Sequence, residues 1–420
     1  MPFCQVIVDI NHTDVDHVFT YRVPKGLAVC PGMRVHVPFG PRKLEGVVVE
    51  MTEECDLPPE RVKDVCGTLE DYPAVLPPLL ALAKDIQKSS FCTLAVALRL
   101  MFPAQMRGQR IHEKQQEVAV LTVAPDVLGQ VIAAQVRAPK RAKVLRALAD
   151  APEMELTTAA LRETVGDCRD ALNALCKMGF VKLEKRETLR RPYGAMERLS
   201  RQDPKLTRQQ EDVLAELLPA VERGKGEFLL YGVTGSGKTE VFIRAVRHAA
   251  QQGKTAIVLV PEIALTPQMV SWFRSRFGED AAVLHSRLSP GERYDEWRRI
   301  RRGDVRVVIG ARSAVFAPLE NVGLIIIDEE HEQSYIADNN PHYDARQLAH
   351  ERCQREGAVL LLASATPSMR SFAMAGRGDL TLLEMPRRVN NRPMPAVHVV
   401  DMREELKKGN RSVFSGALVN

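Results

Sequence analysis

The stretch Gly232-Val233-Thr234-Gly235-Ser236-Gly237-Lys238-Thr239 has the spacing of a phosphate-binding loop: a glycine, four residues, and then Gly-Lys-Thr. An apolar run, Phe228–Tyr231, precedes it, and a helix-compatible run, Glu240–Ala250, follows it. Glycines let backbone N–H groups turn toward an anion at a helix N-terminus, while the lysine adds a charge for the outer phosphates and the threonine hydroxyl a ligand for Mg²⁺. The stretch therefore predicts a nucleoside-triphosphate site.

Apolar, strand-like segments alternate with helix-like segments between residues 200 and 385. Such alternation is typical of a parallel sheet with helices on both faces, whose ligands bind at the carboxyl ends of the strands. We therefore predict a P-loop α/β domain. Its expected strands are Glu227–Tyr231, Ala256–Val260, Ala281–His285, Val305–Ile309, Gly323–Asp328 and Ala358–Ala363.

An acidic run, Asp328-Glu329-Glu330-His331, follows the apolar residues Leu324–Ile327. An Asp at the end of a buried strand can hold the Mg²⁺ that bridges two phosphates, and an adjacent Glu can orient and deprotonate the attacking water. The alternative is a solvated acidic turn. Together with the phosphate loop, the run predicts a nucleotide hydrolase rather than a metabolite kinase, for which a substrate lid would be expected.

Composition limits the class of protein. A chain of 420 residues is too long for one core, and 45% hydrophobic with 26% charged residues is ordinary for a globular protein. No apolar run approaches the roughly 20 residues of a membrane span, and the N-terminus does not resemble a secretory signal. None of the eight cysteines forms a Cys-x-x-Cys pair, which favours reduced thiols in the cytoplasm and no zinc site in these residues. The net charge of +5 is a weak hint of an anionic partner.

Residues 1–105 predict a small β-rich module followed by a helix. Its strand-like runs are separated by Pro and Gly turns, and the helical stretch Leu79–Leu100 is expected to pack on the sheet. The expected strands are Val6–Ile10, Val18–Val23, Arg34–Pro38 and Glu45–Glu50.

The block from Pro139 to Leu189 predicts three helices, Lys143–Ala149, Thr157–Val165 and Cys168–Met178, and a strand at Phe180–Leu183. Three short helices and a strand are the pattern of a winged helix, which binds duplex DNA. The basic residues at its end favour that interpretation, but a structural spacer with a solvated basic face fits equally well. Residues 112–135 predict no clear element.

The acidic run resembles the DEAH-type box of superfamily-two helicases, and other helicase motifs appear in order. Leu206–Gln210 resembles the adenine-reading Gln motif, with Gln210 in the reading position. Pro261–Gln268 resembles motif Ia, and Ser364–Pro367 resembles motif III, which couples hydrolysis to strand movement. The segments Leu284–Ser286 and Gly310–Ser313 resemble the Ib region.

The amino-acid sequences of these motifs are similar to those of the PriA family, the primosomal N′ proteins that restart stalled replication forks. The resemblance spans the whole chain and is most specific over residues 206–367. It implies an ATP-dependent 3′-to-5′ DNA helicase with a RecA-like ATP-binding lobe. It also implies an N-terminal domain that captures the 3′ end of a nascent strand through Phe19, Gly40 and Lys63.

The resemblance assigns further roles. ATP is bound by Gln210 and by Gly232, Val233, Thr234, Gly235, Ser236, Gly237, Lys238 and Thr239; Lys238, Asp328 and Glu329 are catalytic, and Thr239 and Asp328 hold Mg²⁺. Coupling to DNA falls to Glu330, His331, Ser364 and Thr366. DNA contacts fall to Arg312, Tyr335, Tyr343 and Arg346, in addition to the three N-terminal residues.

The chain departs from the family pattern at several positions. Thr20 replaces an acid at the 3′-end site, which puts recognition of the 3′-hydroxyl in doubt. After the acidic box, Ile336-Ala337 stands where the family has Lys-Gln, and Asp344 stands where it has His. Two cationic or ionisable positions are thereby lost, so that coupling of DNA binding to hydrolysis is expected to be weaker.

The expected domains are a 3′-end-binding domain (1–105), a winged helix (112–192), the first helicase lobe (200–385) and the incomplete start of a second lobe (386–420). The family's zinc module and arginine fingers would lie beyond Asn420, so the polypeptide is expected to bind ATP and DNA but to hydrolyse ATP slowly. Expected partners are forked and single-stranded DNA and, by resemblance, single-strand-binding protein and other primosome proteins; a monomer is expected. A fork-binding scaffold without productive hydrolysis and a double-strand DNA translocase are the alternatives.

Overall fold

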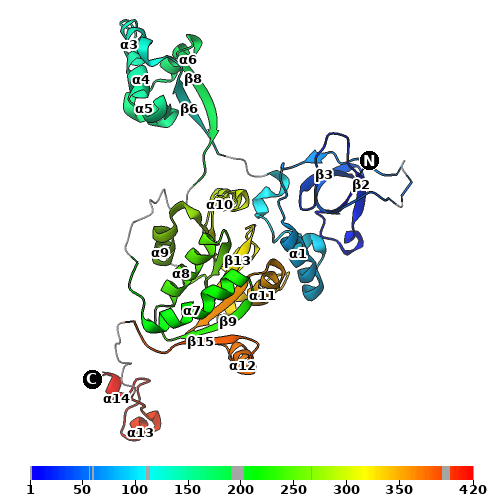
Figure 1. The fold of residues 1–420 in the computed structure, drawn as a ribbon, viewed down its shortest axis with the longest axis vertical. Helices are drawn as coiled ribbons and strands as arrows, with labels where there is room; N and C mark the ends of the chain where they lie inside the picture. Colours follow the sequence, from blue (N-terminus) through cyan, green and yellow to red (C-terminus); the bar gives the residue numbers. More distant parts are fainter. Residues whose placement is uncertain are drawn as a thin grey trace.

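The computed structural model describes residues 2–55, 57–58, 61–109, 114–190, 203–265, 267–389 and 398–419. These residues form three sheets, of five, seven and three strands. Each sheet has its own helices, and Figure 1 shows the corresponding units in blue to cyan, in green to orange, and in cyan to green.

The N-terminal sheet is antiparallel, in the order β2-β1-β4-β3-β5, and the four predicted strands are present in it. Gly46 lies where β4 crosses β1, and a Cβ there would be 2.5 Å from Val6 Cγ1, so that only glycine allows the close pairing. The strands are β1 (Phe3–Val8), β2 (Phe19–Arg22), β3 (Arg34–Phe39), β4 (Arg42–Thr52) and β5 (Gly67–Thr68).

The predicted single helix over Leu79–Leu100 is wrong, since the structure has two, α1 (Pro77–Ser90) and α2 (Leu94–Leu98). Phe91 ends α1 in the left-handed conformation, with φ of 49°. The Thr93 hydroxyl then accepts a hydrogen bond from the Val96 N–H at 3.3 Å and caps α2. The capping residue Thr93 starts a new helix here, although the apolar periodicity of the sequence continues through the break.

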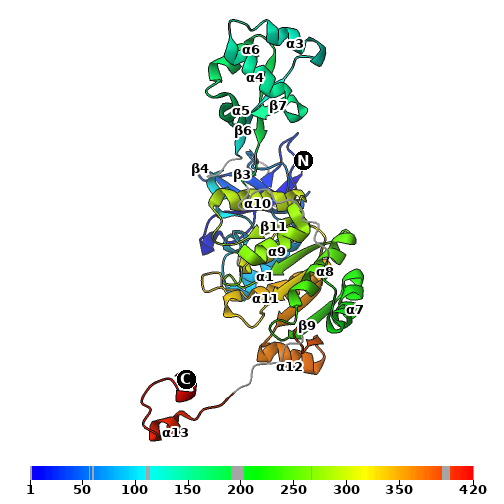
Figure 2. The same ribbon diagram turned by 90° about the vertical axis from the view of Figure 1, so that its left-hand side faces the viewer.

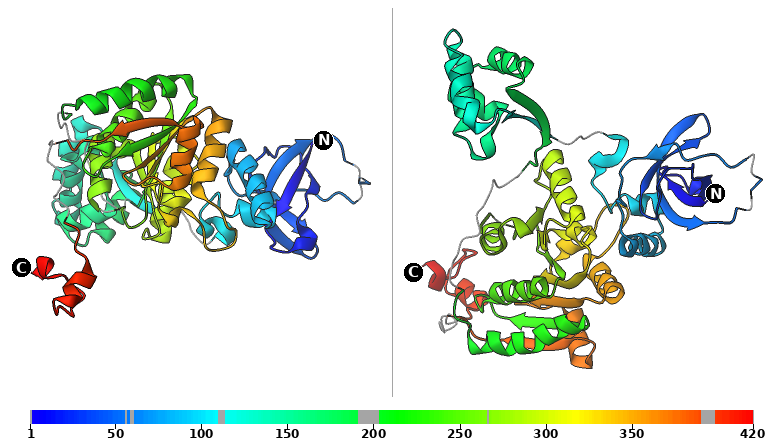
Figure 3. Two further views of the ribbon diagram at one scale, coloured as in Figure 1. Left: turned by 90° about the horizontal axis from the view of Figure 1, so that it is seen from below. Right: turned by 45° about the horizontal axis from the view of Figure 1, so that its top comes forward.

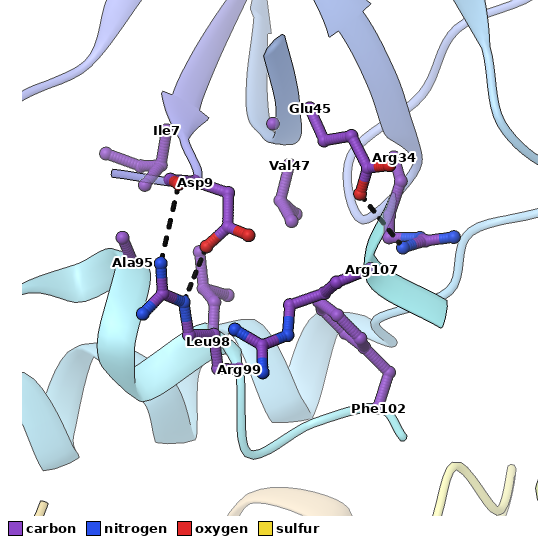
Figure 4. A pocket seen from close by; sticks show the side chains of 11 residues that line it. Ile7, Asp9, Arg34, Glu45, Val47, Ala95, Leu98, Arg99, Phe102 and Arg107 are labelled. Carbon is purple, nitrogen blue, oxygen red and sulfur yellow. Dashed lines mark hydrogen bonds and ion pairs between the residues drawn. The ribbon is translucent and has the colours of Figure 1, made fainter. Parts of the chain in front are cut away.

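A small cavity of about 20 Å³ lies between this sheet and the segment that follows α2. Figure 4 shows Asp9 with Arg99 on one side of it, Glu45 with Arg34 on the other, and Arg107 between them. This volume holds about one water molecule, too little for a ligand. The cluster is therefore a polar junction that joins sheet and helices.

Arg34 is the centre of this junction and is only 3% exposed. Its guanidinium donates to both carboxylate oxygens of Glu70 and to the Met106 carbonyl at 2.8 Å, and it lies over the Phe102 ring. Glu45 is a second carboxylate partner, at 3.5 Å.

We expect Arg34→Met to destabilise this unit by about 3 kcal/mol, because it leaves two largely buried carboxylates without their cation. Hydrogen exchange of the β3 and β4 amides in the whole chain measures the effect, as a roughly hundredfold faster opening. Arg42→Met, at an exposed position on β4, is the control and should stay within about 0.5 kcal/mol. Equal exchange in both variants would contradict the assignment.

The middle unit has a three-stranded antiparallel sheet in the order β7-β6-β8. The three predicted helices are present as α4 (Pro139–Ala149), α5 (Thr158–Val165) and α6 (Arg169–Lys177), and they share one apolar core with the sheet. The expectation that residues 112–135 hold no clear element is wrong. They contain α3 (Pro125–Ala133) and β6, whose first three residues are polar and hide the strand. The strands are β6 (Gln115–Leu121), β7 (Glu155–Thr157) and β8 (Val181–Glu187).

The seven-stranded sheet is parallel, in the order β11-β12-β10-β13-β14-β9-β15. All six predicted strands are present. The sequence analysis missed the edge strand β15, whose buried Leu383 and Met385 alternate with exposed residues instead of forming a continuous apolar run. The strands are β9 (Gly226–Gly232), β10 (Thr255–Leu259), β11 (Ala281–Leu284), β12 (Val307–Gly310), β13 (Val322–Asp328), β14 (Val359–Ser364) and β15 (Thr381–Met385).

Helices cover both faces of this sheet (Figure 2). In β13, Leu324 and Ile326 pack with one set of helices, and Ile325 and Ile327 with the other. The first set is α7 (Arg208–Arg223), α8 (Lys238–Gln251) and α9 (Pro267–Phe277), and the second includes α10 (Pro290–Arg302) and α11 (Ala345–Glu356). The unit is the P-loop α/β lobe that the sequence predicts, and α12 (Met369–Arg377) completes it.

Polar contacts join the three units, which Figure 3 shows from two further directions. The N-terminal unit meets the lobe through Arg301, which donates to the Pro73 carbonyl at 2.7 Å, and through an ion pair between Asp85 and Arg355. Glu187, at the end of β8, pairs with Arg298 and Arg302 of α10.

Residues 398–419 contain two short helices, α13 (Met402–Lys407) and α14 (Gly416–Val419). In the described ranges, no helix combines the length and the apolar character that crossing a bilayer requires.

Candidate nucleotide site and nucleic-acid interface

The phosphate loop connects the carboxyl end of β9 to the N-terminus of α8. Gly235 and Gly237 have φ of 82° and 87°, values that favour glycine. The N-cap of α8 is Gly237, and no side chain of the described residues caps this helix. An uncapped helix N-terminus of this kind can bind an anion.

Inside the loop, Lys238 Nζ donates to the Gly232 carbonyl at 2.8 Å and lies 3.9 Å from Glu329 Oε1. Ser236 is fully buried, and its hydroxyl has no hydrogen-bond partner in the part of the chain that the structure describes. Thr234 is exposed, whereas Val233 and Thr239 are half-buried. An orphaned hydroxyl beside an uncapped helix end fits a phosphate ligand.

Gln210 lies against the same loop, but its amide is already engaged. Its Oε1 accepts from the Thr207 N–H at 2.8 Å, in a capping box that begins α7, and its Nε2 donates to the Gly237 carbonyl at 3.1 Å. A Cβ on Gly237 would lie 2.4 Å from this Nε2. Gln210 thus fastens α7 to the phosphate loop here, and reading of adenine stays a prediction.

Asp328 ends β13, and Glu329 follows it with φ of 46°. Such a conformation is rare for a non-glycine residue and is often found at functional sites. The Glu329 N–H donates to Asp328 Oδ1 at 3.0 Å, and the Glu329 carboxylate points toward Lys238. Burial, together with the negative charge of Glu329, raises the pKa of Asp328 to about 6, against the opposing effect of Lys238.

Three or more metal-ligating residues are not grouped anywhere in the described ranges. A magnesium site here would therefore have to be completed by phosphate oxygens and water. The predicted pair, Thr239 and Asp328, fits that requirement, because Mg²⁺ bound with a nucleotide often keeps only one or two protein ligands.

The acidic run and the end of β14 form one hydrogen-bond network. His331 Nδ1 lies 2.8 Å from Ser364 Oγ, which donates to Glu329 Oε2 at 3.4 Å and accepts from the Thr366 N–H at 2.9 Å. Thr366 itself is exposed. The structure thus brings three of the predicted coupling residues, His331, Ser364 and Thr366, together beside the Glu329 carboxylate.

Glu330 is fully buried and is held by residues that the sequence analysis did not single out. Its carboxylate accepts from the Ser368 N–H at 2.6 Å, from the Ser368 hydroxyl at 3.1 Å and from the Ser371 hydroxyl at 2.9 Å. Ser368 is also the N-cap of α12. Ser368, which follows the proline of motif III, can be recognised in the sequence as a helix-capping residue. The neighbouring sequence does not indicate that it also donates to the distant Glu330.

The predicted DNA-contacting residues of the lobe all lie near the segment that follows the acidic run. Arg312 donates to the Ser334 carbonyl at 3.3 Å and lies over the Tyr343 ring. Tyr343 also packs edge-on against Phe316. Tyr335 is fully buried, and its hydroxyl donates to the Asp328 carbonyl at 2.6 Å, so its contact with DNA stays a prediction.

Arg346 is paired rather than free. It makes a two-pronged contact with Asp344, at 2.9 Å from Nε and 2.8 Å from Nη2, and donates to the Glu330 carbonyl at 2.8 Å. Asp344 thereby neutralises a cation that was predicted to contact phosphate.

The three predicted 3′-end residues lie along β2 and the turn beside it. Phe19 packs edge-on against Phe39, which precedes Gly40 in the β3–β4 turn. The exposed Lys63 accepts, through its carbonyl, a hydrogen bond from the Arg22 N–H at the other end of β2. Since β2 has four residues, Lys63 is roughly 10 Å from Phe19 along the strand.

Comparisons with known proteins agree with this architecture. A family model described as 3′ DNA-binding domain (3′BD) of PriA matches residues 5–103, and the DEAD/DEAH box helicase model matches residues 207–375. Replication restart protein PriA of Bacillus subtilis is 35% identical over 100% of this chain and 60% of its own length. The PriA protein of Synechocystis is 34% identical over 99% of this chain and 58% of its own length.

Over almost its whole length, the chain is similar to these PriA proteins. It spans about 60% of the length of these curated PriA relatives. Among solved structures, RecG bound to a three-way DNA junction is 28% identical over 46% of this chain and 24% of RecG, with a TM-score of 0.35.

Asp328 leads to a prediction about pH. Because its pKa is raised to about 6, the proton is lost only above that pH, and Mg²⁺ must compete with it below. We expect the Mg²⁺ concentration needed for nucleotide binding to rise roughly tenfold per pH unit below pH 6. Titrations of Mg²⁺ against a fluorescent ATP analogue from pH 5 to 8 measure it. The Asp328→Asn variant measures the pH dependence that comes from the nucleotide's own titration. If the Mg²⁺ requirement rises equally steeply with falling pH in this variant, Asp328 is not the group responsible.

Asp344 leads to a second prediction. Asp344→Asn keeps a side chain able to cap α11 but removes the charge that holds Arg346. We expect tighter binding of single-stranded DNA and a salt dependence that steepens by about one phosphate contact. Fluorescence anisotropy at several salt concentrations measures both quantities. In an Arg346→Ala background the same substitution should have no effect, and a gain there would show that Arg346 is not the contact.

Proposed function

We propose that this chain is the DNA-end-binding part and first motor lobe of an ATP-dependent 3′-to-5′ DNA helicase that restarts stalled replication forks. The observation that carries the proposal is the 3.9 Å approach of Lys238 to Glu329. It puts a phosphate-binding cation and a carboxylate able to activate water in one site. Similarity to the PriA proteins, and to the family model of a 3′ DNA-binding domain, supports the choice of DNA as the second ligand.

Bound Mg²⁺·ATP would bring the phosphoryl group to be transferred and a metal that neutralises its developing charge. Lys238 would leave the Gly232 carbonyl, 2.8 Å away, for the outer phosphates. The first-turn N–H groups of α8 would bind the inner ones. Thr239 and Asp328 would hold the metal, and Glu329 would orient the attacking water and take its proton.

Coupling to DNA would run through Ser364. Its hydroxyl lies between His331 and Glu329, at 2.8 Å and 3.4 Å. A displacement of Glu329 during hydrolysis therefore changes the hydrogen bonds of motif III directly. Glu330, locked to Ser368 and Ser371, would carry the change into α12.

The N-terminal unit would hold the 3′ end of a nascent strand. Support comes from the family model over residues 5–103, from the ring of Phe19 and from the exposed Lys63. Aromatic rings and cations are the groups that bind unpaired bases and their phosphates. Single-strand-binding protein and other primosome proteins are the partners proposed for the complete activity, and the active unit is proposed to be a monomer.

We further propose that the 420-residue polypeptide, assayed by itself, turns ATP over slowly. The described residues contain one nucleotide-binding lobe, whereas efficient nucleoside-triphosphate hydrolysis often requires an arginine finger worth roughly 10³- to 10⁵-fold. In the resemblance described above, that arginine comes from a second lobe.

The experiment is ATP hydrolysis by this chain with and without forked DNA. Glu329→Gln is the control, since it keeps the shape of the side chain and removes the base. We expect slow hydrolysis that rises with DNA and is abolished in the control. Turnover of several per second would contradict the claim of a slow lobe, and turnover unchanged in the control would exclude Glu329 as the catalytic carboxylate. Tight fork binding with no ATP dependence would favour a scaffold.

A further inference from the structure

The residues after β15 lie across the phosphate loop. The Val233 N–H donates to the Met385 carbonyl at 3.1 Å, and the Val389 N–H donates to the Gly235 carbonyl at 3.0 Å. Val389 Cγ2 lies 2.9 Å from where a Cβ on Gly237 would be. Residues 386–389, here called the crossing segment, are thus attached to the loop at both ends.

The middle of the crossing segment is attached to α7. Gln209 Nε2 donates to the Arg387 carbonyl at 2.5 Å, and Gln209 Oε1 accepts from the Arg387 N–H at 3.1 Å. The peptide groups on both sides of Arg387 are therefore fixed. This leaves the backbone of the next residue, Arg388, little freedom to turn its side chain away from the loop.

The Arg388 side chain packs on the loop through its aliphatic part. Its Cγ and Cδ lie 3.8 Å and 3.9 Å from where a Cβ on Gly235 would be. Its Nε is shielded from solvent and has no hydrogen-bond partner among the described residues. Burying a guanidinium N–H away from water without a hydrogen-bond acceptor is unfavourable. A bound anion at this position would supply the missing acceptor.

We propose that Arg388 is a nucleotide-binding residue that contacts the phosphate groups held by the loop. The proposal rests on the proposed function, since it assumes that the loop binds a nucleoside triphosphate. A guanidinium is always charged, and its fork of N–H groups matches phosphate oxygens. Arg388 adds a second cation to Lys238 at the loop and strengthens binding of the nucleotide rather than the chemical step.

The test compares two neighbouring arginines in the whole chain. Arg388→Ala removes the proposed contact. Arg387→Ala removes the same charge one residue away, from an exposed side chain, and leaves the backbone pairing with Gln209 in place. Titration with a fluorescent ATP analogue, and competition by ATP and by inorganic triphosphate, measure the affinities.

We expect Arg388→Ala to weaken the binding of ATP and of inorganic triphosphate by about tenfold or more, as for loss of a charged hydrogen bond. Arg388→Lys should restore part of the lost affinity. Arg387→Ala should change either affinity less than twofold. Equal losses in the two alanine variants, or unchanged triphosphate affinity in Arg388→Ala, would overturn the proposal. Thermal unfolding confirms that the variants fold.

Lys238→Ala separates the two levels of the argument. If it leaves ATP affinity unchanged, the nucleotide site itself is wrong and the proposed function fails with it. If Lys238→Ala weakens the binding of ATP while Arg388→Ala does not, the nucleotide site is supported and the assignment of Arg388 is rejected.

Discussion

The site depends on the position of β14 between β13 and β9. Asp328 pairs in register with Ala363, and Ser364 with Tyr231. Neighbouring strands are about 4.8 Å apart, so the acidic run and the phosphate loop end roughly 10 Å from each other. That gap is the one that Lys238 and Glu329 span. Because Ser364 ends the strand between them, its hydroxyl is within reach of the residues that meet there.

Burial gives this arrangement its chemical character. Asp328 and Glu330 lie in the lobe's interior, where an unpaired carboxylate is costly. Glu330 is stabilised by three hydrogen bonds from Ser368 and Ser371. Asp328 instead accepts one N–H and keeps a raised pKa. The first pattern is that of a structural anchor and the second that of a group left for a cation.

Strand patterns and motif spacing predicted much of the lobe, because buried parallel strands are almost continuously apolar. They predicted less where a residue's partner is remote in sequence. The edge strand β15, the break at Phe91 and the strand β6 were missed, since each depends on an alternating pattern, a cap or a polar half-strand. The burial of Tyr335 was missed for a similar reason, because the position of an aromatic residue after a motif does not show whether its ring is buried.

The sequence alone determined the class of fold, the phosphate loop and the carboxylates at the end of β13, because local spacing sets strand–loop–helix geometry. Tertiary structure decided which side chains are free to act. It engaged Gln210 with the loop, tied Arg346 to Asp344, buried Tyr335 and laid the crossing segment with Arg388 over the loop. These contacts form because the sheet and its edges bring segments together that are far apart in the sequence. The spacing of residues within a motif does not show which distant segments will meet.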